Sequence, residues 1–218
     1  MQGKLKIGIM GGTFNPIHYG HLVTAEEAAN QFALDQVIFM PTGNPTYKEN
    51  RDIVEAEHRY LMVVIATASN PKFVVSRMEV DRGGETRSID TISELYDKYR
   101  DSAQLFFITG ADAILEILTW KEPHIVIQKC KFIAATRPGY DILKIRSLDE
   151  SLLGRSLQNS DDKVIYVMEV PALAISSTDI RRRVKEGRPI KYLLPEGVAN
   201  YIQKMGFYLP GKYKKGSG

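Results

Sequence analysis

The sequence predicts an α/β fold in which a doubly wound parallel sheet carries helices on both faces, with a small helical part near the carboxyl end. Short, continuously apolar runs alternate along the chain with longer amphipathic stretches, and no internal repeat breaks this alternation. Continuous apolar runs are typical of strands buried on both faces, as the strands of parallel sheets are. A chain of 218 residues, 44% of them hydrophobic, is long enough for one large domain with a sizeable core. We expect this domain to span residues 1–209, and residues 210–218, rich in Gly and Lys, to form a disordered tail.

The expected elements follow from hydrophobic spacing. The apolar runs predict strands at residues 5–10, 37–40, 73–76, 105–109, 132–135 and 164–170. Apolar residues spaced three and four apart predict helices at residues 21–32, 56–68, 89–98, 113–118, 178–185 and 196–204. In the second of these helices, the spacing predicts that the core-facing residues are Leu61, Val64, Ile65 and Ala68. Because ligands of such sheets bind beyond the carboxyl ends of the strands, the segments that follow the strands are the candidates for a site.

Composition and charge exclude several classes of protein. Basic residues exceed acidic ones by only 29 − 26 = 3, which does not indicate a nucleic-acid partner even with three consecutive arginines at residues 181–183. No stretch reaches the roughly 18 apolar residues that a membrane span needs. The single Cys130 can form neither an internal disulfide nor a Cys-rich metal cage. We therefore expect a cytoplasmic enzyme or binding protein, with no nucleic acid and no membrane among its partners.

The segment after the first strand, GGTFNPIHYGH at residues 11–21, carries the strongest chemical signal. It is neither a Walker A loop nor a G-x-G-x-x-G fingerprint. Gly11 and Gly12 let the backbone turn sharply and let a bulky anion approach. His18 and His21 lie three residues apart at a helix start, so both imidazoles share one face beside free backbone N–H groups. Phosphate is the ligand that such a set of donors favours.

Two other readings of the histidine pair stay open. A histidine at a helix start is more often a cap or a surface residue than a catalyst, and two at helical spacing can form half of a zinc site. Zinc needs three or four protein ligands, however, and neither Cys130 nor the isolated His58 and His124 has helpful spacing. We therefore favour phosphate binding and expect no metal held by the protein alone.

A second segment, ISSTDIRRR at residues 175–183, opens a helix near the carboxyl end. Ser176, Ser177 and Thr178 place hydroxyls and backbone N–H groups at the positive end of that helix, and Arg181 lies about one turn further in. Taken alone, this is an ordinary helix cap followed by a solvated basic face. Together with the first segment it predicts a polyphosphate clamped between two helix amino ends.

These segments resemble the nucleotidylyltransferase superfamily, and among its members they are most similar to the bacterial nicotinate-mononucleotide adenylyltransferases. The resemblance covers about residues 7–205 and rests on motifs in the family's order: GGTFNPIHYGH, PTGNPTYK, Asp90-Thr91, GAD at 110–112, Trp120, RPG at 137–139 and ISSTDIR. It implies a Rossmann-like sheet of the nucleotidylyltransferase type. It also implies a reaction of NAD biosynthesis, in which ATP and nicotinate mononucleotide give deamido-NAD and pyrophosphate, with Mg²⁺ bound mainly through the ATP phosphates.

The resemblance also implies roles for individual residues. It makes His18 and His21 the catalytic pair, in contact with the ATP phosphates. The further ATP-binding residues that it implies are Gly11, Gly12, Thr13, Phe14, Gly110, Asp112, Ile175, Ser176, Ser177, Thr178 and Arg181. The mononucleotide-binding residues that it implies are Asn15, Lys48, Thr86, Trp120 and Arg137. Judged from the residues alone, Asp112 is equally a helix cap, Trp120 a core residue, and Lys48 and Arg137 solvated charges.

Two departures from the family pattern bear on the acceptor. The family's Pro-Pro-His-Lys is Pro-Thr-Tyr-Lys at residues 45–48, and its Ser-Tyr-Thr is Thr-Arg-Ser at residues 86–88. The second loop binds the nicotinate carboxylate through backbone N–H groups in relatives, so the preference for acid over amide stays open. The alternatives are nicotinamide mononucleotide or phosphopantetheine as acceptor, or a nucleotide-binding module without turnover. A homodimer or a higher homo-oligomer also remains open.

Overall fold

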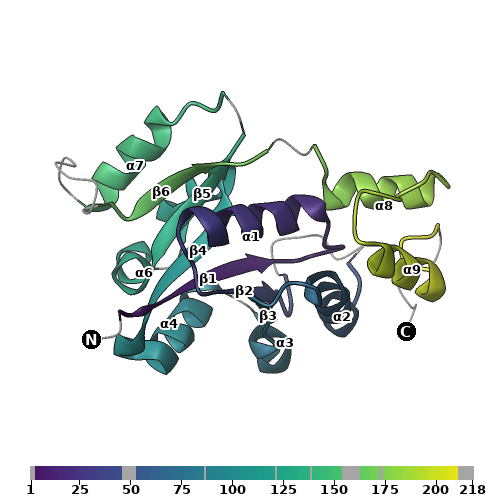
Figure 1. Cartoon of the computed structure of the whole chain (residues 1–218), viewed down its shortest axis with the longest axis horizontal. Coiled ribbons are helices and arrows are strands. Elements are labelled where there is room, and N and C mark those ends of the chain that lie inside the picture. Colours follow the sequence, from purple (N-terminus) through teal and green to yellow (C-terminus); the bar gives the residue numbers. More distant parts are fainter. Residues whose placement is uncertain are drawn as a thin grey trace. The chain divides into compact units, whose positions relative to one another are not determined.

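The computed structural model describes residues 3–45, 53–85, 87–120, 122–137, 139–153, 163–171 and 174–210. Its strands form a six-stranded sheet in the order β3-β2-β1-β4-β5-β6 (Figure 1). Their bounds are β1 Leu5–Gly12, β2 Gln36–Pro41, β3 Phe73–Val75, β4 Ala103–Gly110, β5 Lys131–Thr136 and β6 Ile165–Glu169. The pairings of β1 with β4, β4 with β5, and β5 with β6 are parallel. The predicted α/β fold with a parallel sheet is confirmed.

The helices alternate with these strands, as the spacing of apolar residues predicts. Their bounds are α1 Tyr19–Gln31, α2 Ala56–Thr67, α3 Met78–Arg82, α4 Ser88–Tyr99, α5 Ala111–Ile114, α6 Pro123–Lys129, α7 Leu143–Leu153, α8 Ser177–Lys185 and α9 Glu196–Met205, with 3-10 turns at Arg100–Ser102 and Ile117–Thr119. The helix expected at 113–118 is instead α5 and a 3-10 turn, whose buried Ile114 and Ile117 are three residues apart. Helices α3, α6 and α7 lie outside the predicted elements. No helix among the described residues has the length and hydrophobicity to cross a membrane.

The chain divides into two compact units, of which the first comprises residues 1–11, 23–38 and 87–172. Its strands β1, β4 and β5 are buried over most of their length, with Ile7 paired to Leu105 and Ile9 to Phe107 across β1 and β4. Gly8 of β1 is required by close packing, because a Cβ there would lie 2.8 Å from Leu34 Cδ1 and 2.9 Å from Ile108 Cδ1.

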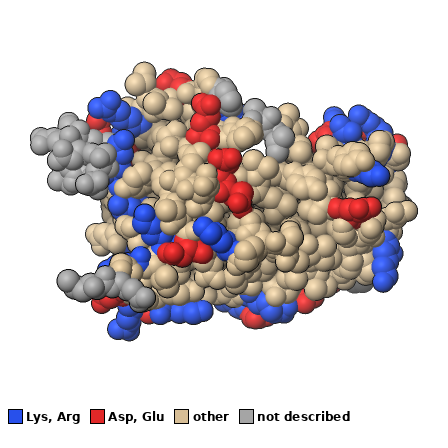
Figure 2. All heavy atoms as spheres, viewed as in Figure 1, with Lys and Arg blue, Asp and Glu red and all other residues tan. Residues whose placement is uncertain are grey.

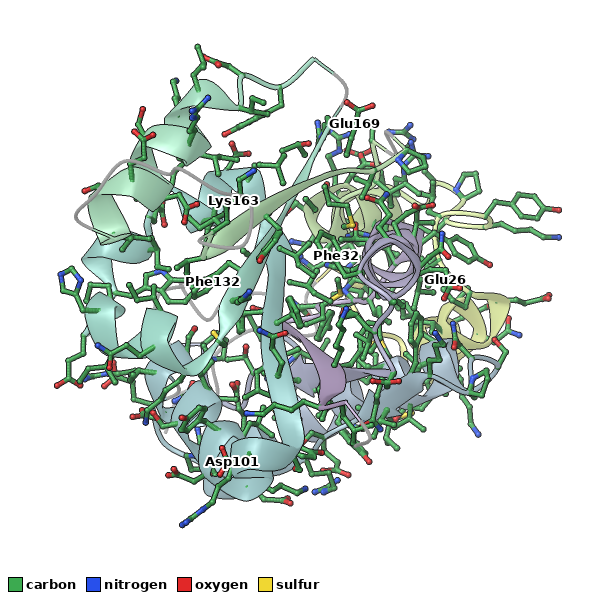
Figure 3. All side chains as sticks on the ribbon, turned by 60° about the vertical axis from the view of Figure 1, so that its left-hand side comes forward. Glu26, Phe32, Asp101, Phe132, Lys163 and Glu169 are labelled. Atoms are coloured by element: carbon green, nitrogen blue, oxygen red, sulfur yellow. The ribbon has the colours of Figure 1, made fainter. Side chains whose placement is uncertain are left out.

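Aromatic rings fill much of the first unit. Phe32, labelled in Figure 3, lies 5.7 Å from the ring of Tyr166 on β6, with the two rings nearly perpendicular. Phe132 of β5 is fully buried, and its ring lies 6.0 Å from that of Phe107 on β4. Edge-on and tilted contacts of this kind are favourable for aromatic side chains, so they fix the orientation of the rings as well as bury them.

The second unit comprises residues 12–22, 39–86 and 173–218, and α2 packs there against β3, α3 and α9. The prediction of the core-facing side of α2 is wrong: Ile65 and Ala68 are exposed, and Leu61 and Val64 are half-buried. The buried residues are Arg59, Met62, Val63, Ala66 and Thr67. The spacing of apolar residues misses this face because a charged residue, Arg59, begins it.

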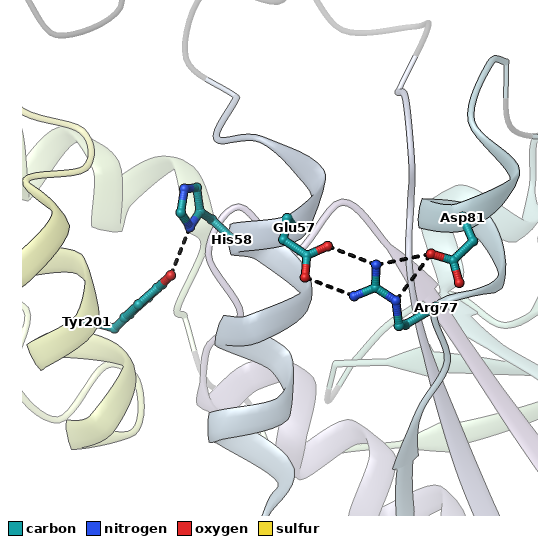
Figure 4. Close-up of polar contacts among 5 residues, drawn as sticks. All are labelled: Glu57, His58, Arg77, Asp81 and Tyr201. Carbon is teal, nitrogen blue, oxygen red and sulfur yellow. Dashed lines mark hydrogen bonds and ion pairs between the residues drawn. The ribbon is translucent and has the colours of Figure 1, made fainter.

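Polar contacts tie α2 to its two neighbouring helices (Figure 4). Arg77 binds both carboxylate oxygens of Glu57 at 2.9 and 3.0 Å and also contacts Asp81 of α3 at 3.0 Å. The hydrogen bond from Arg77 lowers the pKa of the exposed Glu57 carboxyl below its ordinary value. On another side of the helix, His58 Nδ1 lies 2.8 Å from the hydroxyl of Tyr201 on α9.

The expectation of one domain over residues 1–209 stays a prediction. Of the expected tail, residues 211–218 lie outside the described residues.

Candidate functional site

The loop between β1 and α1 is buried, although it contains several polar residues. Thr13, Asn15 and His18 are each at most 7% exposed. Phe14 adopts a left-handed backbone conformation with φ 46°, and its ring lies 5.1 Å from His21, edge to face. A Cβ at Gly12 would approach the Phe14 ring to 3.2 Å, so the small residue at 12 makes room for that ring.

The two predicted catalytic histidines lie against each other. The rings of His18 and His21 stack with centroids 3.7 Å apart and planes inclined by 27°. The backbone N–H of His18 donates to His21 Nδ1 at 3.2 Å, so that nitrogen is an acceptor and the ring proton of a neutral His21 sits on Nε2. A Cβ at Gly20 would lie 3.0 Å from His18 Cε1 and Nδ1, so glycine at position 20 leaves the space that the His18 ring occupies.

Burial determines the charge state of His18. It lowers the pKa of the imidazole from 6.5 to about 4, so the ring is neutral near pH 7. A neutral imidazole carries one N–H donor and one acceptor nitrogen. His18 Nδ1 is buried and makes no hydrogen bond.

The start of α8 contacts the same loop. Ser176 caps the helix, its hydroxyl accepting from the backbone N–H of Asp179 at 3.1 Å. Ser177 donates its hydroxyl to the carbonyl of Pro16 at 2.8 Å. The backbone N–H groups of Ser177 and Thr178 lie in the first turn, where the helix supplies no acceptor for them, so they can donate to an anion.

Arg181, one turn into α8, completes this junction. Its Nη1 donates to the carbonyl of Asn15 at 2.9 Å, and its Nη2 lies 3.4 Å from Thr178 Oγ1. Its Nε is buried and has no hydrogen-bond partner. Within the second unit, Ser177 and Arg181 thus contact the loop that leads into the histidine pair.

The remaining arginines of the triplet are used differently. Arg182 and Arg183 both pair with the carboxylate of Asp179 on the same helix. On the face drawn in Figure 2, acidic side chains lie among the basic ones rather than leaving a continuous basic surface. Arg182 and Arg183 thus belong to an ion-paired face of the helix.

Five predicted binding residues belong to the first unit: Gly11, Gly110, Asp112, Trp120 and Arg137. The interpretation of Asp112 as a helix cap is wrong, because Gly110 occupies the cap position of α5. Asp112 is exposed, and Tyr140 donates to its Oδ1 at 3.5 Å. Arg137 is exposed directly after β5.

Trp120 is half-buried and held by two core aromatic rings. Its ring meets Phe107 at 5.8 Å and 81°, and Phe132 at 6.1 Å and 71°. Both phenylalanines are buried, so their contacts fix the plane of the indole. The core interpretation and the stacking interpretation of Trp120 are thus compatible, since one edge packs while part of the ring stays accessible.

Asn15 already uses its side-chain oxygen within the protein. Its Oδ1 accepts from the backbone N–H of Val54 at 3.2 Å and from the hydroxyl of Tyr208 at 2.8 Å. Two further mononucleotide candidates, Lys48 and Thr86, lie outside the described residues. Among the residues that the structure describes, no group of three or more His, Cys, Asp or Glu side chains is placed to hold a metal ion.

The comparisons with known proteins give a consistent result. Residues 9–183 match the family model described as cytidylyltransferase-like. A relative from Thermoanaerobacter sp. (strain X514), named "Probable nicotinate-nucleotide adenylyltransferase", is 55% identical over 208 residues, covering 95% of this chain and 96% of the relative. A relative of the same name from Moorella thermoacetica is 54% identical over 214 residues, covering 97% of this chain and 96% of the relative.

The solved structures extend the likeness to the fold. Plasmodium falciparum nicotinic acid mononucleotide adenylyltransferase, solved in complex with NaAD, aligns with a TM-score of 0.73 at 22% identity. The alignment covers 94% of this chain and 97% of the other. At this identity the likeness concerns the fold, and it agrees with the parallel sheet described above.

Proposed function

The chain belongs to the cytidylyltransferase-like family and, within it, to the nicotinate-nucleotide adenylyltransferases, and we propose from this membership that it transfers the adenylyl group of ATP to nicotinate mononucleotide. The products are deamido-NAD and pyrophosphate. The acceptor and the residues that bind each substrate are part of this proposal.

One observation about the site carries the proposal. Among the described residues, the buried side-chain atoms without a hydrogen-bond partner are His18 Nδ1 and Arg181 Nε, and both belong to the two predicted phosphate-binding motifs. Buried polar atoms are almost always paired, so unpaired ones call for a ligand. Arg181 and the amino end of α8 supply positive charge and N–H donors that suit the β- and γ-phosphates of ATP.

The chemistry needs no general base. The phosphate oxygen of the mononucleotide is already anionic when it attacks the α-phosphorus, and the bond between that phosphorus and the β-phosphate oxygen breaks as pyrophosphate leaves. Catalysis then consists of holding the two substrates in line and stabilising the charge that develops on the transferring group. A neutral His18 beside the α-phosphate can donate one hydrogen bond there, while Arg181 and the Ser177 and Thr178 amides hold the leaving pyrophosphate.

The proposed mononucleotide set includes two residues of the first unit, Trp120 and Arg137. We assign Trp120 to the pyridine ring, because the two phenylalanines that hold its edge pre-orient the indole for stacking. Arg137 would bind the phosphate of the mononucleotide. On the ATP side, Asp112 would bind a ribose hydroxyl beside Gly110. Lys48, Thr86 and Asn15 complete the proposed mononucleotide set.

The residues present fit a Mg²⁺ ion that enters with ATP. Mg²⁺ prefers oxygen ligands and usually retains waters and substrate phosphates rather than occupying an all-protein cage. The donors around the two motifs are imidazole and guanidinium groups and hydroxyls, which suit the phosphates rather than the metal. When bound, the ion neutralises charge on the triphosphate.

A pyrophosphate-release assay tests the proposal. ATP is supplied with nicotinate mononucleotide, nicotinamide mononucleotide or phosphopantetheine in parallel, and we expect the fastest release with nicotinate mononucleotide. Faster release with either other acceptor would reassign the substrate. ATP binding without release from any acceptor would make the protein a nucleotide-binding module.

A further inference from the structure

A buried arginine holds the loop after β1, and none of the predicted motifs includes it. Arg59 of α2 is 1% exposed and donates three hydrogen bonds of 2.8 Å to backbone carbonyls. The acceptors are Thr13 for Nη1, Gly43 for Nη2 and Val54 for Nε. Since Thr13 follows β1 and Gly43 follows β2, one guanidinium group links the loops at the carboxyl ends of two strands.

A second buried side chain reaches the same loop from a distant part of the sequence. Tyr208 is 1% exposed, and its hydroxyl donates to Asn15 Oδ1 at 2.8 Å. That oxygen also accepts from Val54 N–H, while the carbonyl of Val54 accepts from Arg59. These bonds are shielded from water, so breaking one leaves a buried polar atom unsatisfied.

The loop carbonyls matter for anion binding because each carries partial negative charge. The Thr13 carbonyl is bound by Arg59, the Asn15 carbonyl by Arg181, and the Pro16 carbonyl by Ser177. Hydrogen bonds to a guanidinium are charge-assisted and stronger than neutral ones. Because these carbonyls already accept hydrogen bonds, they repel a triphosphate beside the histidine pair less than free carbonyls would.

We propose that Arg59 and Tyr208 are positioning residues of the ATP site, which hold residues 13–16 in the conformation that receives the phosphates. They act through Thr13 and Asn15 and do not touch the substrate themselves. The inference rests on the proposed function for its kinetic readout, and a second readout is independent of catalysis.

The kinetic experiment compares two variants of α2. Arg59→Lys keeps the positive charge, but one ammonium cannot reproduce a planar fork that reaches three carbonyls. Met62→Ala is the matched control: Met62 is fully buried on the same face of α2 and can donate no hydrogen bond, so its loss affects packing alone. Both are assayed at a temperature where circular dichroism shows them folded.

We expect Arg59→Lys to raise KM for ATP about tenfold, the scale of a lost buried hydrogen bond, with KM for nicotinate mononucleotide within about twofold of the parent. Met62→Ala should lower the melting temperature and leave both KM values within about twofold of the parent. An equal KM for ATP in the two variants would overturn the inference.

Hydrogen exchange provides the readout that does not depend on catalysis. Tyr208→Phe removes a single hydroxyl, so it keeps the ring packing. In both Tyr208→Phe and Arg59→Lys we expect amide exchange in a peptide covering residues 11–18 to quicken at least about fivefold, with a peptide covering β5 unchanged. Unchanged exchange in the loop of both variants overturns the inference even if the parent is active. A parent that releases no pyrophosphate refutes the proposed function, and exchange then decides the positioning role by itself.

Discussion

The hydroxyl of Ser177 donates a 2.8 Å hydrogen bond to the carbonyl of Pro16, although 161 residues separate the two in sequence. A second hydrogen bond joins Arg181 to the carbonyl of Asn15. The two motifs that predict phosphate binding are therefore joined directly, before any ligand arrives. This junction is ordered without a ligand, which lowers the cost of binding an anion at the proposed site.

Removing this bond should weaken the site without unfolding the protein. Ser177→Ala should lower the free energy of unfolding by about 0.5–1.5 kcal/mol and raise KM for ATP several-fold, because the Pro16 carbonyl loses its donor. Denaturant titration and steady-state kinetics measure the two effects. Ser147→Ala, at an exposed position of α7, is the control and should change neither quantity. A Ser177→Ala enzyme with the parent's KM for ATP would count against the junction.

Alanine at position 20 should damage activity more than stability. Its Cβ would lie 3.0 Å from two atoms of the His18 ring, so the ring must move. Alanine otherwise favours a helix over glycine by about 1 kcal/mol, which opposes any loss of stability. We expect kcat to fall about 10–100-fold while the melting temperature stays near that of the parent. If the melting temperature fell together with kcat, Gly20 would be needed for folding and not specifically for the position of the His18 ring.

Protein stability should fall in mildly acid solution because of His18. In the unfolded chain this histidine takes up a proton near pH 6.5, whereas burial keeps the pKa in the folded protein at about 4. The unfolded state therefore binds more protons between these values, so this contribution is complete above pH 6.5 and is lost as the pH falls toward 4. The difference between the two pKa values corresponds to about 3 kcal/mol of unfolding free energy, which is lost in full once the pH is below both values.

A variant that cannot titrate tests this assignment. His18→Gln should flatten the dependence of unfolding free energy on pH between 6.5 and 4, as followed by urea denaturation at several pH values. An identical slope in the variant and the parent would mean that other groups cause the acid dependence.

Loss of the tryptophan ring should weaken the binding of the mononucleotide but not that of ATP. Trp120→Ala removes the proposed stacking surface for the pyridine ring, so we expect the mononucleotide to bind about tenfold more weakly while ATP affinity changes little. Isothermal titration with each substrate alone measures both affinities. Equal weakening of the two would contradict stacking and leave Trp120 as a packing residue beside Phe107 and Phe132.

The backbone geometry of the two motifs could be predicted because it is determined locally. Two glycines after an apolar run, histidines three apart and a hydroxyl-rich helix start each specify a backbone geometry within a few residues. The parallel sheet was also predictable, since its strands are formed by short and mostly apolar runs. The direct bonds between the two motifs were not, because they depend on contacts between residues 161 and 166 positions apart.

Arg59 shows where the spacing rule fails. A buried face is normally found by its apolar residues, so an arginine whose partners are backbone carbonyls looks exposed in sequence. The pattern of Met62, Val63 and Ala66 at three, four and seven residues beyond it was the available signal. Helix α7 carried a similar spacing signal, because its buried residues Ile145, Leu148 and Leu152 lie three, four and seven positions apart.

The bond between Asn15 and Tyr208 also has a consequence for protein synthesis. The loop at residues 13–16 leaves the ribosome early, but one of its buried partners is added 193 residues later. A nascent chain that ends before that tyrosine lacks the donor its asparagine requires. Prematurely terminated chains should therefore be poor competitors for cellular nucleotide.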